Sequence, residues 1–146
     1  MNRTASTAMR RGQQPVSAGI PVSAAMHSGV LTCRTDASLA DVAELMATHR
    51  VHCIVVTDDP GDAGSLWGIV SDLDLAAAAS VRNLAEQTAG ATAATAVLTI
   101  APDETVQRAA QLMTEHCTTH LVVVDAGHRP VGILSTLDVA AALGES

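Results

Sequence analysis

The sequence of 146 residues allows one ordinary domain or two small halves that share a core, and it carries a net charge of −7 with one aromatic residue, Trp67. This acidic, lysine-free composition argues against a nucleic-acid partner, which needs a basic face, and against a polybasic membrane contact. Three widely spaced cysteines without a Cys-x-x-Cys pair, and no apolar run long enough to span a bilayer, predict a protein of the reducing cytoplasm.

The chain is expected to begin with a tail and a short helix. Residues 1–14 are polar and have no apolar periodicity, which predicts a disordered tail. A short helix within residues 15–26 then leads into a strand over residues 30–33. Nothing in these residues indicates chemistry of its own.

An amphipathic helix follows this strand. Ser38 is its expected N-cap, and Leu39, Val42 and Met46 fall on one face at helical spacing. The helix should end near residues 49–50. The apolar face predicts that the helix packs on a sheet.

A β-hairpin and a second helix complete this half of the chain. The β-branched run at 53–57 predicts a buried strand, and the Asp, Pro and Gly residues at 58–62 predict a turn. Residues 67–71 should form the return strand. An alanine-rich helix is expected over 72–81.

The pattern then repeats after a link that contains a helical turn around residues 84–88. Val97-Leu98-Thr99 repeats Val30-Leu31-Thr32 at a shift of 67 positions, and by Gly132 the shift has fallen to 64 because the second hairpin loop is three residues shorter. Each half therefore has the order strand, helix, strand, strand, helix. The two halves predict one α/β module of two β-α-β-β-α repeats related by a pseudo-two-fold axis. The predicted boundaries are 15–81 for the first repeat, 82–96 for the linker and 97–144 for the second repeat.

A nearly identical motif marks the last strand–helix junction of each half. The run Gly68-Ile69-Val70-Ser71-Asp72-Leu73-Asp74-Leu75 returns as Gly132-Ile133-Leu134-Ser135-Thr136-Leu137-Asp138-Val139. A serine followed three residues later by an acid has the spacing of a capping box, so helix capping alone would account for one copy. The recurrence of glycine, serine and aspartate together favours an additional shared role.

In this order of motifs the chain resembles the cystathionine β-synthase-type domain, the CBS domain, whose tandem pair is called a Bateman module. The resemblance covers residues 15–144 and rests on two independent copies of Gly-h-h-Ser-x-x-Asp, where h is apolar. One departure is that the family often has proline early in the second strand, where this chain has Val55 and Val122. We expect this change to leave the fold intact.

The resemblance implies a regulatory module that binds an adenosine-containing ligand, with AMP, ADP, ATP and S-adenosylmethionine as candidates and no required cofactor. A carboxylate can accept two hydrogen bonds from a ribose diol, and a hydroxyl at a helix start suits a phosphate, which agrees with this role. Met46 and Met113 are interpreted as core residues. The nucleotide-binding residues that the resemblance implies are Thr32, His52, Cys53, Ser71, Asp74, Thr99, Thr119, His120, Ser135 and Asp138.

The acidic balance also bears on the ligand and the partners. Surplus acid would repel a triphosphate unless Mg²⁺ intervened, which favours a monophosphate or a sulfonium ligand over ATP. Modules of this family commonly pair, so a homodimer is expected. Since no effector domain accompanies the two repeats, we expect occupancy to be signalled in trans to a partner protein that the sequence does not name.

Three other functions compete with this hypothesis. Two histidine and cysteine clusters suit zinc by residue type, but a helix end passing directly into a strand should keep their side chains apart. An enzyme is disfavoured because no nucleophile elbow, no phosphate-binding Gly-x-x-x-x-Gly-Lys and no lysine are present. A ligand-free assembly module remains open, since the alanine-rich helices invite close helix contact. The zinc candidates are His49, His52 and Cys53 in one cluster and His116, Cys117 and His120 in the other.

Overall fold

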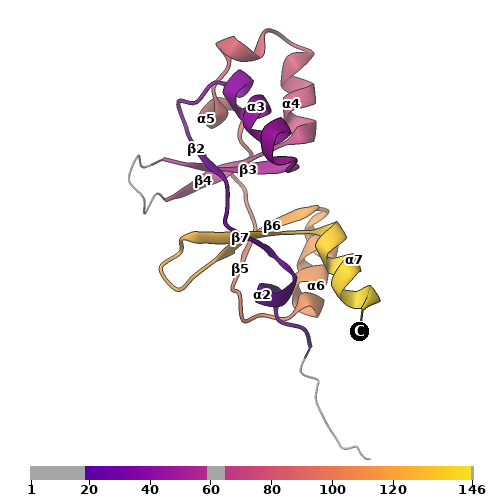
Figure 1. Cartoon of the computed structure of the whole chain (residues 1–146). Coiled ribbons are helices and arrows are strands. Elements are labelled where there is room, and N and C mark those ends of the chain that lie inside the picture. The colour runs from indigo at the N-terminus through magenta and orange to yellow at the C-terminus, as the bar shows by residue number, and fades with distance from the viewer. Residues whose placement is uncertain (1–18, 59–64, 146) are drawn as a thin grey trace, which may run out of the picture.

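The computed structural model describes residues 19–58 and 65–145. Two layers of sheet pack against each other, and helices cover the outer face of each sheet (Figure 1). The predicted tail at 1–14 and most of the predicted turn at 58–62 lie outside the described residues. No helix in the described part of the chain is long and apolar enough to cross a membrane.

The first repeat forms a three-stranded sheet in the order β2-β3-β4. Helix α3 begins where the Ser38 side chain accepts a hydrogen bond from the Asp41 N–H, and it ends at Arg50, which adopts a left-handed conformation. The expected strand, helix, strand, strand, helix order is confirmed, although the first strand lies slightly later than predicted. The elements are β2 (Thr32–Arg34), α3 (Leu39–His49), β3 (Cys53–Thr57), β4 (Leu66–Ser71) and α4 (Asp72–Ala79).

The second repeat has the same order of elements. Its long helix begins at Thr105, which caps the Arg108 N–H, and ends at left-handed Cys117, the position equivalent to Arg50. In both repeats the second strand lies between a parallel and an antiparallel neighbour. The elements are β5 (Thr99–Ile100), α6 (Val106–His116), β6 (His120–Val124), β7 (Pro130–Ser135) and α7 (Thr136–Gly144).

The segment that precedes each repeat packs on the other repeat. Helix α2 (Val22–Ala25) and strand β1 (His27–Ser28) precede the first repeat, yet β1 pairs with β7 and makes the second sheet four-stranded. The 3₁₀-helix η1 (Leu84–Glu86) and helix α5 (Ala89–Thr92) precede the second repeat, yet they pack on the first. The two repeats therefore exchange their leading segments, which the sequence did not predict.

The exchanged contacts are reciprocal, as a near two-fold relation requires. Backbone bridges join Pro21 to Thr105 and Ser38 to Thr88, which are the same pair of positions with the roles of the repeats reversed. The bridge from Ile69 to Ala94 likewise matches the pairing of β1 with β7. These matches confirm the predicted pseudo-two-fold arrangement.

The core has three parts that follow from alternation along the central strands. Residues of β3 and β6 face alternately toward the helices and toward the other sheet, as the two-residue period of a strand dictates. Ile54 and Leu121 enter the cores beneath the helices, whereas Val55 and Val122 meet between the sheets. All four are fully buried, so both faces of each sheet are covered.

The glycine of each repeated motif lies beneath the exchanged segment. A side-chain carbon at Gly132 would stand 2.9 Å from the His27 carbonyl oxygen and 2.5 Å from Met26 Sδ. At Gly68 it would meet the Ala94 carbonyl oxygen at still closer range. These positions need glycine because the backbone of the crossing segment lies directly over the strand.

Candidate functional site

Each repeated motif forms a capping box at the start of its last helix. The Ser71 hydroxyl accepts from the Asp74 N–H at 3.1 Å, and Asp74 Oδ2 accepts from the Ser71 N–H at 2.9 Å. Ser135 and Asp138 make the same two bonds at 3.1 and 2.8 Å. We call Ser71 with Asp74 the first capping motif and Ser135 with Asp138 the second. Helix capping thus accounts for Oδ2 of each carboxylate, whereas Oδ1 takes no part in the cap.

The remaining carboxylate oxygens differ between the motifs. Within residues 19–58 and 65–145, no hydrogen bond or ion pair reaches Asp74 Oδ1. Asp138 Oδ1, in contrast, lies 3.0 Å from Nε2 of His27 on β1. The exchange of leading segments places this histidine next to the second capping motif.

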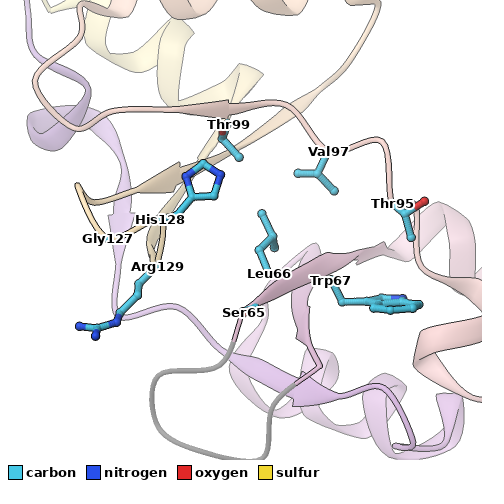
Figure 2. Close-up of a pocket in the computed structure, with 9 residues that line it drawn as sticks. All are labelled: Ser65, Leu66, Trp67, Thr95, Val97, Thr99, Gly127, His128 and Arg129. Carbon is cyan, nitrogen blue, oxygen red and sulfur yellow. The ribbon is translucent and has the colours of Figure 1, made fainter.

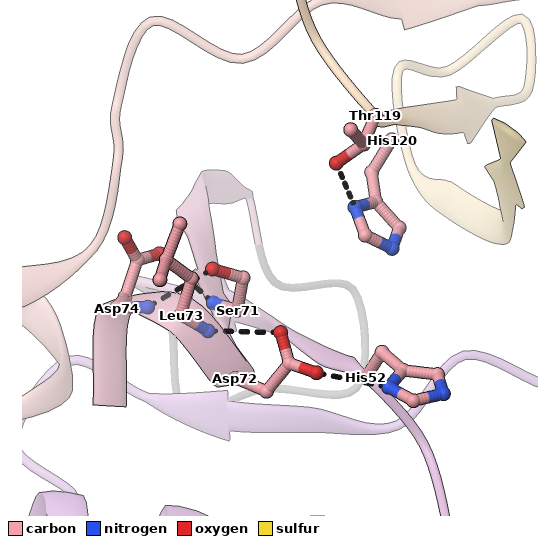
Figure 3. Close-up of polar contacts among 7 residues, drawn as sticks. All are labelled: His52, Ser71, Asp72, Leu73, Asp74, Thr119 and His120. Carbon is pink, nitrogen blue, oxygen red and sulfur yellow. Dashed lines mark hydrogen bonds and ion pairs between the residues drawn. The ribbon is translucent and has the colours of Figure 1, made fainter. Parts of the chain in front are cut away.

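A histidine–carboxylate pair lies beside the first capping motif. His52 Nδ1 and Asp72 Oδ2 are 2.9 Å apart, and Asp72 Oδ1 accepts from the Leu73 N–H at 2.8 Å (Figure 3). The hydrogen bond from His52 is the main reason that the pKa of Asp72 is lowered. A carboxylate bonded in this way stays ionised and faces solvent.

His120 connects the two repeats electrostatically. Figure 3 shows its ring extending from the start of β6 toward the part of the first repeat that holds His52 and Asp72. Burial lowers the pKa of His120 below its ordinary value, Asp72 and Asp138 act to raise it, and His52 lowers it further. Thr119 Oγ1 lies 3.0 Å from His120 Nδ1. Groups from both repeats therefore share one polar region between them.

Cys53 occupies the position equivalent to His120 in the first repeat. Its side chain is buried, and burial, followed by the nearby Asp72 and Asp74 charges, raises its pKa to about 11. The thiol is therefore neutral and is not an activated nucleophile. At this site Cys53 acts as a small, weakly polar side chain that packs in the interior.

A hollow of about 430 Å³ opens between the repeats, near the start of β4 and the turn that joins β6 to β7 (Figure 2). The Trp67 Nε1–H donates to the Gly90 carbonyl at 3.1 Å, which holds the ring. Figure 2 shows Leu66 directed into the same space as Val97 and Thr99. The lining residues are Ser65, Leu66, Trp67, Thr95, Val97, Thr99, Gly127, His128 and Arg129.

The structure separates the predicted site residues into two groups. Thr99 is the one predicted residue that lines the hollow, and Thr32 lies on β2 opposite Val55. The others lie at the opposite end of the central strands, where β3 and β6 begin and β4 and β7 end. These residues are His52, Cys53, Ser71, Asp74, Thr119, His120, Ser135 and Asp138.

Neither of the two candidate zinc clusters brings its side chains together. His49 Nδ1 lies 3.1 Å from the Leu45 carbonyl, and His116 Nδ1 lies 3.2 Å from the Leu112 carbonyl, so both rings turn back along their own helices. Among the described residues, no group of three or more His, Cys, Asp and Glu side chains is arranged to hold a metal ion.

Comparison with known families tests the resemblance to the CBS domain. The family model of the CBS domain matches residues 22–81 and again residues 92–145. The chain belongs to the CBS-domain family. The order of repeats and the Gly-h-h-Ser-x-x-Asp motif thus predicted the family correctly, and CBS-domain pairs are typically regulatory rather than catalytic.

One curated relative and several solved structures resemble this CBS-domain pair. The CBS domain-containing protein CBSX3, mitochondrial, of Arabidopsis thaliana is 30% identical over 118 residues. That match covers 77% of this chain and 56% of the relative, so the chain spans about half the length of that protein.

Solved CBS-domain pairs share the fold. The CBS-domain pair of protein MJ0100, in complex with 5′-methylthioadenosine and S-adenosyl-L-methionine, is 24% identical with a TM-score of 0.76, covering 85% of this chain and 99% of that one. CBSX2 in complex with AMP is 26% identical with a TM-score of 0.69, covering 87% and 98%. The CBS-domain protein ATU1752 of Agrobacterium tumefaciens is 23% identical with a TM-score of 0.76, covering 90% and 99%.

Two residues of the polar region were missed as site residues by the sequence analysis. Asp72 was interpreted as part of the helix start, and its equivalent Thr136 gave no repeated signal. His27 carries no motif, and its neighbour Asp138 is far away along the chain. The repeat shift relates His27 to Ala94, but only the exchange of segments shows that His27 reaches the second capping motif.

Proposed function

We propose that this CBS-domain pair binds an adenosine-containing ligand between its repeats and passes occupancy to a partner protein. The observation that carries this proposal is Oδ1 of Asp74, an acceptor beside a capped helix start that no hydrogen bond or ion pair reaches from the described residues. A ribose diol is the matching donor pair for such a carboxylate. The bound AMP in CBSX2, and the two adenosine compounds with MJ0100, give the chemical class to test first.

The start of helix α4 adds a favourable field for an anion. The eight residues Asp72–Ala79 align their backbone dipoles toward Ser71, and His52 stands beside this helix start. Against this, Asp72 and Asp74 place two carboxylates in the same turn. A ligand of low negative charge fits this balance better than a triphosphate does.

Few cations are available to offset a triphosphate. Arg34 already pairs with Asp36 at 3.4 Å, and Arg129 lines the hollow at the other end of the sheets. We therefore expect AMP or S-adenosylmethionine to bind more tightly than ATP. Calorimetric titration without magnesium tests this order, and ATP binding far more tightly than AMP would contradict it.

Conservative substitutions test the proposed function without removing the caps. Asp74→Asn and Asp138→Asn each keep an oxygen for the serine N–H but replace the other oxygen by an NH₂ group, which cannot accept a hydrogen bond from a ribose hydroxyl. We expect each to weaken AMP binding by about tenfold or more at its own site, measured by calorimetry. Asp41→Asn, an exposed acid in the first turn of α3, is the control and should change nothing.

A ligand panel gives the broader test. AMP, ADP, ATP, S-adenosylmethionine and NAD are added at millimolar levels while thermal unfolding is followed. A ligand that binds only the folded state raises the melting temperature with concentration. No shift with any of them would favour a ligand-free assembly module instead.

Self-association is a second proposed property, favoured by two exposed leucines. Leu73 and Leu137 occupy equivalent positions in α4 and α7, and their residues are 75% and 76% exposed. We propose that they contribute to a homodimer. Sedimentation should show a dimer that the double variant Leu73→Ser/Leu137→Ser weakens, whereas Val81→Ser, equally exposed, should not. A monomeric wild type would contradict the proposal.

A route of signalling and a location complete the proposal. Ligand between the repeats would bias their relative arrangement, and the size of that bias is limited by the difference in affinity for the two arrangements. We propose that a separate effector protein senses this change in trans. A cytoplasmic location agrees with the free thiols of Cys33, Cys53 and Cys117.

A further inference from the structure

The two capping motifs make the same internal hydrogen bonds, but the chain segments that pass beside them carry different side chains. Strand β1 passes the second motif with its residues paired to β7, His27 to Ile133 and Ser28 to Gly132. At the equivalent place beside the first motif, the backbone of Ala94 bridges to Ile69. The same backbone path therefore carries a histidine beside the second motif and an alanine at the equivalent position of the first.

We propose that His27 makes the two ligand positions unequal, so that the first adenosine ligand binds at the first capping motif. His27 occupies Oδ1 of Asp138 in the free protein, whereas Oδ1 of Asp74 has no partner among the described residues. The order of binding rests on the proposed function. The contact between His27 and Asp138 does not, and it is tested separately below.

The geometry supports a contact that a ligand can displace. His27 Nε2 lies 3.0 Å from Asp138 Oδ1, while Oδ2 of the same carboxylate accepts from the Ser135 N–H at 2.8 Å. The Asp138 side chain is 9% exposed, whereas the His27 side chain is 79% exposed. The carboxylate is thus covered on both oxygens, but the group that covers Oδ1 is free to swing into solvent.

Competition follows from the number of acceptors. A ribose diol approaching Asp138 needs Oδ1, since Oδ2 already serves the helix cap. At Asp74 the corresponding oxygen meets no partner within the described residues 19–58 and 65–145. A ligand at the second motif must therefore break one bond that a ligand at the first motif does not.

The repeat supplies a pair of opposite substitutions as the test. His27→Ala gives the second motif the side chain that the first has, and Ala94→His gives the first motif the side chain that the second has. The control is Ser28→Ala, because Ser28 is the other residue of β1 and is also exposed. AMP is titrated into each protein by calorimetry, with Asp74→Asn and Asp138→Asn used to assign the two binding steps.

We expect His27→Ala to strengthen AMP binding at the second motif by about three- to tenfold and to leave the first step unchanged. Ala94→His should weaken the first step by a similar factor, and Ser28→Ala should match the wild type. The factor is modest because a pair with one highly exposed partner contributes little. An unchanged or weaker second step in His27→Ala, or an unaffected first step in Ala94→His, would overturn the proposal.

A measurement without ligand separates this proposal from the proposed function. The NMR signals of the His27 ring should move in Asp138→Asn and stay in place in Asp41→Asn. If AMP binds to none of the proteins, the proposed function fails for AMP and the order of binding fails with it. Unmoved His27 signals would instead overturn the contact itself, even if AMP binds.

Discussion

In the first repeat, His52 pairs with Asp72, whereas the equivalent positions of the second repeat hold Thr119 and Thr136. The backbone bond between these positions is nevertheless the same in both, since the Asp72 N–H reaches the His52 carbonyl at 2.9 Å and the Thr136 N–H reaches the Thr119 carbonyl at 3.0 Å. The fold therefore depends on the backbone at this junction, and the side chains are free to differ in chemistry.

The same contrast holds at two further pairs of positions. Cys53 is replaced by His120, and Ala94 is replaced by His27. Each exchange changes which groups near the capping motifs carry charge, while the capping boxes remain. The two repeats thus share a backbone structure around the capping motifs but differ in the charges nearby. Substitutions at equivalent positions should have equal effects where the structure is shared and unequal effects where the charges differ.

The largest expected effects come from the core, where the repeats should behave alike. Ile54→Ala and Leu121→Ala remove equivalent, fully buried side chains, and each should lower the free energy of unfolding by about 2–5 kcal/mol. Because the exchanged segments tie the repeats together, both should act on one unfolding transition in urea. Val81→Ala, at an exposed site, is the control. Two separate transitions would show that the repeats fold independently.

The crossing of the exchanged segments should be the next most sensitive feature. Gly68→Ala and Gly132→Ala each place a carbon against a backbone carbonyl and should cost about 1–3 kcal/mol in urea unfolding. Gly68→Ala should cost more, since flexible Met26 can yield at Gly132 whereas the Ala94 backbone cannot yield as easily. Gly144→Ala, which meets no atom within 4 Å, is the control. Equal stability of all three variants would contradict the close crossing.

The capping boxes should contribute equally in the two repeats. Ser71→Ala and Ser135→Ala each remove the hydroxyl acceptor of a helix N–H and should lower the stability by about 0.5–2 kcal/mol, measured by urea unfolding. Since the two hydroxyl bonds are both 3.1 Å long, the two losses should agree closely. A cost at only one serine would show that the motifs differ in structure and not only in surroundings.

The smallest effect should be a pH dependence that comes from the unequal positions. Burial lowers the pKa of His120, so the unfolded chain binds this proton more readily. The stability should be full above the ordinary histidine value of 6.5 and should fall as the pH drops below it toward the lowered pKa. His120→Cys installs the first-repeat residue. The free energy of unfolding of this variant, measured in urea, should depend less on pH across this range than that of the wild type.

Asp72 should act in a lower range of pH. Its lowered pKa means that the carboxylate stabilises the fold above its ordinary value of 3.8 and that this contribution is lost as the pH falls further. His116→Gln, at an exposed helix end, is the control for both ranges. If His120→Cys keeps the full slope between pH 7 and 5, His120 is not the group responsible.

Local signals in the sequence predicted most of the fold. Ser38 and the two capping serines mark helix starts because a helix N-terminus needs side-chain acceptors within a few residues. The period of the apolar residues predicted which helix face is buried. The constant repeat shift then predicted two matching halves and, through the motif at Ser71 and Ser135, the family itself. Each of these signals is contained in a short stretch of chain.

Tertiary structure alone decided which repeat the leading segments join and which side chains meet at the capping motifs. Strand β1 has two residues and helix α2 has four, too few to show any periodicity, and β1 pairs with a strand that is distant in the sequence. The contacts of His27 with Asp138 and of His52 with Asp72 depend on that packing. Helix caps and apolar periodicity depend on neighbouring residues, whereas these contacts join residues far apart in the sequence and form only when the chain folds.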